Sequence, residues 1–176
     1  RDRYVETQNP KTWMSKKDIE TIDKTSLTIP LMDSQEYEIL LQMCSGSIRL
    51  GSVSKCYTGE IDLSLNKKYV RLDDKFATML RGAQVQKYYT TNNISQGDIL
   101  YLDSALYLGE NSSPKSLHHQ RKRIVMQGIT GVNERYRLKM TISNAGVFCA
   151  NSVNYLLIDE NDIEYYLALC NSHLLN

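Results

Sequence analysis

The sequence predicts an α+β fold built on a mixed, mainly antiparallel sheet with flanking helices. Helix-type spacing of apolar residues is found near the two ends of the chain, and short β-type runs separated by Gly, Asn, Asp and Ser occupy the middle. An order of helix, many strands and helix is typical of α+β domains. With 176 residues, of which 41% are hydrophobic, the chain can bury one sizeable core.

Two helices are predicted in the N-terminal part. The stretch SKKDIETID can begin a short helix at Ser15. In DSQEYEILLQMCSG, Asp33 is followed three residues later by Glu36, the spacing of a capping box. We therefore expect a helix over about 34–45 and interpret residues 1–49 as a helical or linker segment.

From Leu50 onward the pattern predicts short strands, separated by turn-forming stretches such as TTNNISQGD. The predicted strands lie in LGSVSKCYTG, KKYVRL, DILYLD, RIVMQGI, YRLKMTI, VFCANSV and NYLLI. Helical spacing returns in DIEYYLALCNSHLL, with Asp162 or Asn161 as the expected cap. One face of this helix is predicted to carry Ile163, Tyr166, Leu167, Cys170 and Leu174.

The net charge of +1 hides two oppositely charged segments. Seven basic residues and the single acid Glu134 lie between Lys115 and Lys139, which gives this stretch a charge of +6. The C-terminal stretch carries four acids within six positions, Asp159, Glu160, Asp162 and Glu164. One hypothesis is therefore a protein-interaction module whose acidic helix docks a basic partner.

The four cysteines, Cys44, Cys56, Cys149 and Cys170, are scattered without a CxxC pair. They are interpreted as reduced and mostly buried thiols of an intracellular protein. No apolar run approaches the roughly 20 residues of a membrane span. Because the chain starts at Arg1 and stops within the apolar pattern NSHLLN, we expect it to be a piece of a longer polypeptide.

Motifs of enzymatic chemistry are weak. The nine glycines form neither a GxGxxG motif nor a P-loop. His118 and His119 would point to different faces of a strand, so we interpret them as solvated or phosphate-facing loop residues and not as metal ligands. Glu60 and Asp62, followed by two lysines, loosely match the acids of a metal-dependent nuclease, although the spacing differs. Their alternative interpretation is a polar loop.

The stretch HHQRKRIVMQGITGVNERYRLKMTI, residues 118–142, predicts a β-hairpin around the turn TGVNE, whose Gly and Asn suit positive φ angles. Alternation places Arg123 and Gln127 on one face of the first strand, and Arg137 and Lys139 together on one face of the second. Cations and amides displayed together suit phosphates and base edges. The alternative is a solvated face that keeps the protein soluble.

Five phrases carry a family resemblance: LGSVSKCYTGEIDLSLNKKYV, MLRGAQVQKYY, KRIVMQGIT, GVFCANSVNYLLI and IEYYLALCNSHLLN. In this order they resemble segments of the TaqI-like C-terminal specificity domain. That domain is the target-recognition domain of adenine-N6 DNA methyltransferases and of fused type II restriction-modification enzymes. The resemblance covers roughly residues 50–176. It implies a target-recognition-domain-like fold there and sequence-specific binding of double-stranded DNA.

The resemblance also implies that catalysis lies elsewhere. An N-terminal methyltransferase domain of the same polypeptide would bind S-adenosylmethionine and flip the target adenine, and Mg²⁺ would be needed if the parent also cleaves DNA. Such a domain is identified by an NPPY-type motif, whereas the only NP here is Asn9-Pro10, followed by Lys11. We expect this chain to be non-catalytic, with no cofactor, metal or membrane partner of its own, in the bacterial cytoplasm.

Sixteen residues are predicted to contact DNA. The phosphate candidates are three consecutive cations expected at a sheet edge: Arg121, Lys122 and Arg123. The hairpin residues that could contact bases or position the backbone are Gln127, Thr130, Arg135, Arg137 and Lys139. The Gly-containing segment contributes Arg81, Gln84, Gln86 and Lys87, and the first strand contributes Lys55 and Tyr57. The last two are Asn151 and Ser152, whose alternative role is a turn that satisfies its own backbone.

Overall fold

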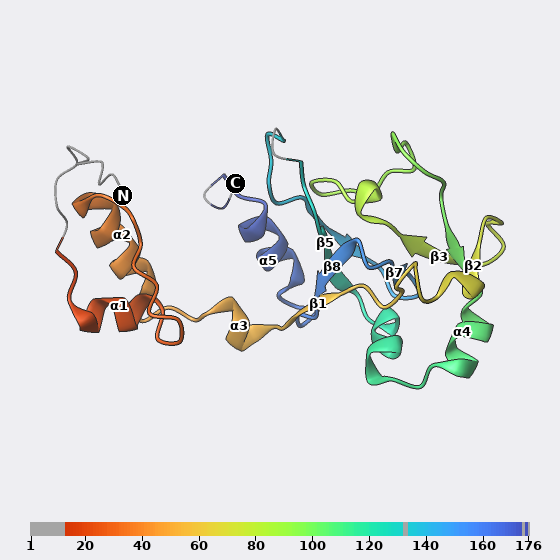
Figure 1. The fold of residues 1–176 in the computed structure, drawn as a ribbon, viewed down its shortest axis with the longest axis horizontal. Helices are drawn as coiled ribbons and strands as arrows, with labels where there is room; N and C mark the ends of the chain where they lie inside the picture. The colour runs from red at the N-terminus through yellow and green to blue at the C-terminus, as the bar shows by residue number, and fades with distance from the viewer. Residues whose placement is uncertain (1–12, 132–133, 174, 176) are drawn as a thin grey trace, which may run out of the picture. The chain divides into compact units, whose positions relative to one another are not determined.

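The computed structural model describes residues 13–131, 134–173 and 175, and it divides into two compact units, Arg1–Arg49 and Leu50–Asn176 (Figure 1). Within the described residues, none of the helices has the length and apolar character needed to cross a lipid bilayer.

The first unit contains the two predicted helices, α1 (Lys16–Ile22) and α2 (Ser34–Cys44), which pack against each other. Each begins with a capping box, formed by Ser15 in α1 and by Asp33 with Glu36 in α2. The guanidinium of Arg49 donates to the carbonyl oxygens of the last turn of α1, at 2.6 Å from Thr21 O. Both helix predictions are confirmed, including the start of α2.

The strands of the second unit form two sheets of four strands each. The first has the order β1-β8-β5-β6, with all neighbours antiparallel. Its strands are β1 (Cys56–Thr58), β8 (Val153–Leu156), β5 (Arg123–Gln127) and β6 (Met140–Ser143). The second has the order β2-β4-β3-β7, with only β3 and β7 parallel. Its strands are β2 (Val70–Arg71), β4 (Tyr101–Leu102), β3 (Ala77–Leu80) and β7 (Phe148–Cys149).

The α+β class with mainly antiparallel pairing is therefore confirmed, although the strands form two sheets where one was expected. The β5–β6 hairpin is present, with Val125 opposite Thr141. The predicted first strand is wrong at its start, because α3 (Leu50–Val53) precedes β1. In the hairpin turn, Gly131 is not among the glycines with positive φ, and Asn133 lies outside the described residues.

The remaining helices of the second unit are short. They are η1 (Lys67–Tyr69), η2 (Gly82–Gln84), α4 (Ser104–Glu110), η3 (Pro114–Gln120) and α5 (Ile163–Cys170). The C-terminal helix was predicted from its apolar spacing, and Ile163, Leu167 and Cys170 are buried as expected. Leu174, predicted on the same face, lies outside the described residues.

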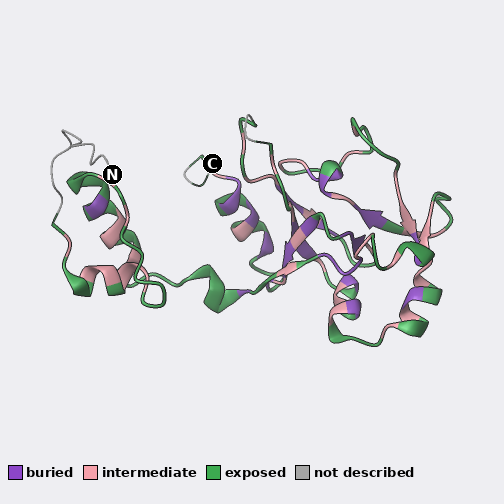
Figure 2. Cartoon of the chain, in the orientation of Figure 1, coloured by how far each residue is buried: buried purple, intermediate pink, exposed green. Residues whose placement is uncertain are grey.

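Three apolar clusters hold the second unit together, and Figure 2 shows the buried residues gathered on its strands. One cluster joins β5, β6 and β8 to α5 and contains Ile124, Ile163 and Leu167. A second contains Val125 and Tyr155 together with residues of β3 and β7. The third packs β3, β4 and β7 against Tyr107 of α4. Strand β5 is thus buried on both faces, since neighbouring residues Ile124 and Val125 belong to different clusters.

Candidate nucleic-acid interface

Residues 85–90 form a small hairpin that projects a tight turn. Val85 and Thr90 pair as an antiparallel bridge, and the amide of Gln86 donates to the carbonyl oxygen of Tyr89 at 2.9 Å. The amide of Tyr88 donates to Met140 O at 2.8 Å, which fixes the turn to the first residue of β6. Tyr88 has a φ of 74°, a conformation that is uncommon for a residue other than Gly. The turn is therefore held in a strained conformation beside the β5–β6 hairpin.

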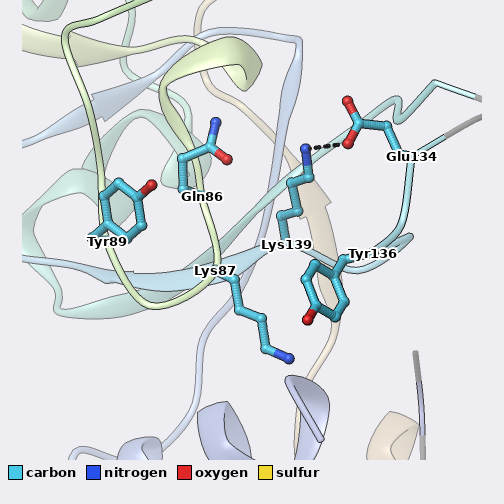
Figure 3. A pocket seen from close by; sticks show the side chains of 6 residues that line it. All are labelled: Gln86, Lys87, Tyr89, Glu134, Tyr136 and Lys139. Atoms are coloured by element: carbon cyan, nitrogen blue, oxygen red, sulfur yellow. Dashed lines mark hydrogen bonds and ion pairs between the residues drawn. The ribbon is translucent and has the colours of Figure 1, made fainter. Parts of the chain in front are cut away.

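This turn and the segment before β6 line a shallow, open pocket of about 320 Å³ (Figure 3). The pocket is lined by Gln86, Lys87, Tyr89, Glu134, Tyr136 and Lys139. Three of the six residues, Gln86, Lys87 and Lys139, are predicted DNA contacts. The structure therefore brings Lys87, from a segment with few charges, next to the basic segment 134–139, which is far away in sequence.

The two lysines of the pocket have different partners. The ammonium of Lys139 lies 2.9 Å from Oε2 of Glu134, and only 13% of the Lys139 side chain is exposed. The ammonium of Lys87 lies 4.4 Å from the centre of the Tyr136 ring, a cation–π arrangement. Among the described residues, no carboxylate lies within ion-pair distance of Lys87. The guanidinium of Arg135, 5.3 Å from the same ring, adds a further exposed cation.

Ser152 ties together the backbone segments that lead to the pocket. Its hydroxyl oxygen accepts from the amide of Gly82 at 2.9 Å, and its carbonyl oxygen accepts from the amide of Gly128 at 2.9 Å. A Cβ at Gly82 would lie 2.6 Å from Ser152 O, so this approach requires glycine. Asn151 is exposed, and its amide donates to Ile61 O at 2.8 Å. The two residues do lie in a turn, in which the amide of Val153 donates to Ala150 O at 2.9 Å, but the bonds above connect them to other segments instead of to their own backbone.

Arg123 is not a surface cation, and its prediction as a phosphate contact is wrong. Its side chain is fully buried and forms an ion pair with the equally buried Glu60. It also donates to Val147 O at 2.8 Å, and its guanidinium carbon lies 4.2 Å from the centre of the Tyr155 ring. The second oxygen of Glu60 accepts from the amide of Cys149 at 3.0 Å. The pair therefore joins β5 to β7 inside the protein.

The other two cations of the predicted phosphate run, Arg121 and Lys122, differ in whether they form an ion pair. Strand β5 lies between β8 and β6, so the run does not begin an edge strand as expected. Lys122 forms an ion pair with Glu164 of α5 at 2.8 Å. Arg121 is exposed, and no ion pair to its side chain is found in the described part of the chain. Of the three consecutive cations, only Arg121 is thus available to an external anion without breaking an ion pair.

The Gly-containing segment is also partly structural. Gln84 is only 2% exposed; its Oε1 accepts from the amide of Arg81 at 2.9 Å, and its amide nitrogen donates to Asn92. Its prediction as a DNA contact is therefore wrong. Arg81 is half-buried and donates to Asp98 O at 2.8 Å, across Gly97. Both residues shape the loop that ends in the pocket turn.

The remaining candidates lie around these features. Lys55 is exposed, whereas Tyr57 is half-buried and stacks on Tyr155. Thr130 donates to Arg137 O at 3.2 Å, and Arg137 in turn donates to Gly131 O. Strand β6 begins only at Met140, so residues 134–139 do not alternate as a strand; Tyr136 and Lys139 line the same pocket.

Gln127, at the end of β5, is half-buried and extends the ladder through its amide, which donates to Lys139 O at 3.3 Å. Its side-chain Oε1 is buried and has no hydrogen-bond partner in the part of the chain that the structure describes. A buried amide oxygen normally has a partner. The backbone of Gln127 thus supports the hairpin next to the pocket, and the oxygen of its side chain does not face solvent.

The two histidines lie in η3 and not on a strand. His119 is buried and stacks on Phe148 at 4.1 Å between ring centres, so its prediction as a solvated residue is wrong. Nδ1 of His118 lies 2.8 Å from the hydroxyl of Tyr155. Burial lowers the pKa of His118 below its usual range, and burial raises the pKa of the Tyr155 hydroxyl. Both groups are therefore neutral at pH 7.

The contacts of Glu60 argue against the hypothesis of a metal-dependent nuclease. Both oxygens of Glu60 are engaged inside the protein, one by Arg123 and one by the amide of Cys149. Asp62 accepts from the amides of Ser64 and Leu65, which is the ordinary role of an Asp in a turn. No three His, Cys, Asp or Glu side chains of the described residues are grouped to share a metal ion. The polar-loop interpretation fits Asp62, whereas Glu60 is buried and belongs to the interior of the protein.

Sequence reasoning missed three residues of the pocket: Tyr89, Glu134 and Tyr136. A signal for the tyrosines was present, because each directly follows or lies close to predicted basic contacts in QKYY and ERYR. Nothing local indicated that these two segments meet. Comparison with protein-family models and with curated proteins gives no match for this chain.

Proposed function

We propose that residues 50–176 form a sequence-specific recognition module for double-stranded DNA. The observation that carries the proposal is the pocket surface, where Lys87, Lys139 and two tyrosines from separate segments meet beside the β5–β6 hairpin. The resemblance of five ordered phrases to TaqI-like specificity domains supports the same conclusion. The surface defined by the six pocket residues together with Arg135 is called the pocket surface below.

The chemistry of this surface suits a polyanionic duplex. Lys87 is open to an external anion, since its ammonium lies over the rings of Tyr88 and Tyr136 and, among the described residues, no carboxylate is within ion-pair distance of it. Lysines that contact phosphates release condensed counterions, which makes binding strongly salt-dependent. Gln86 contributes an amide that can donate to and accept from base edges. The exposed rings of Tyr88 and Tyr89 offer flat surfaces for sugar or base contacts.

In this proposal, the chain positions DNA and another domain performs the chemistry. As the resemblance implies, an N-terminal methyltransferase domain of the same polypeptide would bind S-adenosylmethionine and modify adenine in a bacterial cytoplasm. The parent would need Mg²⁺ only for cleavage. The side chains of the pocket surface do not form a set of catalytic acid, base and nucleophile.

The test is a binding titration of the chain with fluorescently labelled duplex DNA of random sequence, followed by anisotropy at several salt concentrations. We expect affinity to fall steeply with salt, and Lys87→Gln to reduce the slope of log K against log salt by about 1. Lys67→Gln is the matched control, because Lys67 is exposed in the same unit and does not line the pocket.

Sequence specificity is tested separately. Selection of bound duplexes from the random pool should enrich one short sequence, and Gln86→Ala should broaden that selection more than it weakens binding. Salt-insensitive binding by the unmodified chain, or an equal effect of Lys87→Gln and Lys67→Gln, would contradict the proposal.

A further inference from the structure

The Lys139–Glu134 ion pair lies within the pocket surface. Glu134 is the only acid among the residues that line the pocket, and its carboxylate lies 2.9 Å from the Lys139 ammonium. Figure 3 shows the Lys139 side chain directed toward Glu134, while Lys87 points toward Tyr136. The pocket therefore contains two cations, one of which is already neutralised.

The two partners of this pair differ in how firmly they are held. The Lys139 side chain is only 13% exposed, so most of its stem is covered by the protein. The Glu134 side chain is 46% exposed, so solvent is open to its carboxylate if the pair breaks. An ion pair with an exposed partner contributes little stability, so it breaks readily when a stronger anion arrives.

We infer that Glu134 is an intramolecular competitor for a phosphate site on Lys139. The inference rests on the proposed function for its ligand, a backbone phosphate of double-stranded DNA. In the free protein the carboxylate occupies the position that a phosphate oxygen takes in the complex. On binding, the phosphate displaces Glu134, contacts Lys139, and is attracted also by Lys87 across the pocket.

This arrangement affects selectivity as well as affinity. A weakly bound or single anion has to displace Glu134 without other contacts, whereas a duplex that already contacts the surrounding cations does so at little cost. Glu134 therefore lowers non-specific binding to isolated phosphates and makes Lys139 contribute only when DNA is docked. The protein therefore binds phosphates more weakly than it would if Lys139 had no carboxylate partner.

The inference is tested by measuring binding of sodium pyrophosphate and of the random duplex to the full chain and to three variants. Glu134→Gln removes the competing charge. Glu134→Asp keeps the charge but withdraws the carboxylate from Lys139 by one methylene group. Glu160→Gln is the control, because it removes an equal charge from an exposed acid that does not line the pocket. Amide chemical shifts of Tyr88 and Lys139 report whether pyrophosphate enters the pocket.

We expect Glu134→Gln and Glu134→Asp both to tighten pyrophosphate and DNA binding, by about two- to fivefold, the change that corresponds to the loss of an exposed ion pair. Glu160→Gln should leave both affinities unchanged. If only Glu134→Gln tightens binding and Glu134→Asp equals the unmodified chain, general charge repulsion explains the result and the competitor role is refuted.

The inference also falls if neither variant changes pyrophosphate binding, or if pyrophosphate leaves the amides of Tyr88 and Lys139 unaffected in all variants. If pyrophosphate binding tightens as expected while no variant binds the duplex, the phosphate site guarded by Glu134 stands and double-stranded DNA as its ligand is refuted. The two failures are thus distinguished by which of the two ligands responds.

Discussion

Replacement of Arg123 by Met is expected to destabilise the second unit severely. Arg123 and Glu60 are both fully buried, and the guanidinium also donates to Val147 O and lies over the Tyr155 ring. Met approximates the length of the Arg stem but has no charge. The variant therefore leaves the Glu60 carboxylate buried with one neutral hydrogen bond, from the amide of Cys149.

The magnitude follows from that uncompensated charge. Removing one partner of a buried ion pair costs about 3–5 kcal/mol, whereas the total stability of a domain is about 5–15 kcal/mol. For a unit of this size the loss corresponds to a fall in Tm of about 10–20 °C. Replacing Glu60 by Gln in the same variant removes the charge and keeps an acceptor for Cys149. The double variant should therefore regain about 2 kcal/mol or more.

The assay is thermal and urea unfolding followed by circular dichroism. The matched control is Lys122→Met, because Lys122 is the adjacent residue and its partner Glu164 is exposed. This control should leave Tm almost unchanged. If Arg123→Met and Lys122→Met have the same Tm, or if the double variant is less stable than Arg123→Met alone, the argument from the buried pair is refuted.

Two further predictions concern the packing around the pocket and the buried thiols. Gly82→Ala should destabilise the protein by about 1–3 kcal/mol, because the new Cβ would lie 2.6 Å from Ser152 O. Gly109→Ala, in open space on α4, should stabilise the protein slightly. Urea unfolding of both variants measures the difference, and equal stability of the two would contradict the prediction. Burial raises the pKa of the Cys149 thiol to about 12, so only about one part in a thousand is thiolate at pH 9. Iodoacetamide labelling followed by mass spectrometry should therefore increase from pH 7 to 9 at the exposed Cys56 and not at Cys149, and labelling of Cys149 in the folded protein would contradict its burial.

Features set by neighbours in sequence were predictable from the sequence. The capping box of Asp33 and Glu36 fixes the start of α2, because both bonds are made within one helical turn. The apolar spacing of the C-terminal segment predicts the buried face of α5 in the same way. The pairing of β5 with β6 was also predictable, because the two strands are consecutive in the sequence. Their connection, residues 128–139, is longer than the predicted turn, because β6 begins only at Met140. The division of the strands into two sheets was not predictable, since it depends on pairings such as that of β3 with β7.

The candidate site was harder to predict because charge alone does not indicate which side chains face solvent. Three adjacent and chemically similar cations have three different environments. Arg121 is exposed, Lys122 forms a surface ion pair, and Arg123 is fully buried. What separates them is the position of two carboxylates, Glu164 and Glu60, each more than forty residues away in sequence. A buried Arg is stable only where such a partner reaches it, and local sequence does not show that partner.

The same reasoning explains why the pocket surface is a better candidate for the interface than the basic run itself. Lys87 belongs to a segment with few charges, so a search for clustered cations gives it little weight. In the folded protein, however, Lys87 retains its charge over Tyr136, while the more basic hairpin loses part of its charge to internal acids. In the free protein, the cations open to an external anion are therefore those that the fold leaves without internal acids, whereas Lys139 would first have to lose Glu134. A salt-dependence measurement on Lys87→Gln tests the contribution of the unpaired cation.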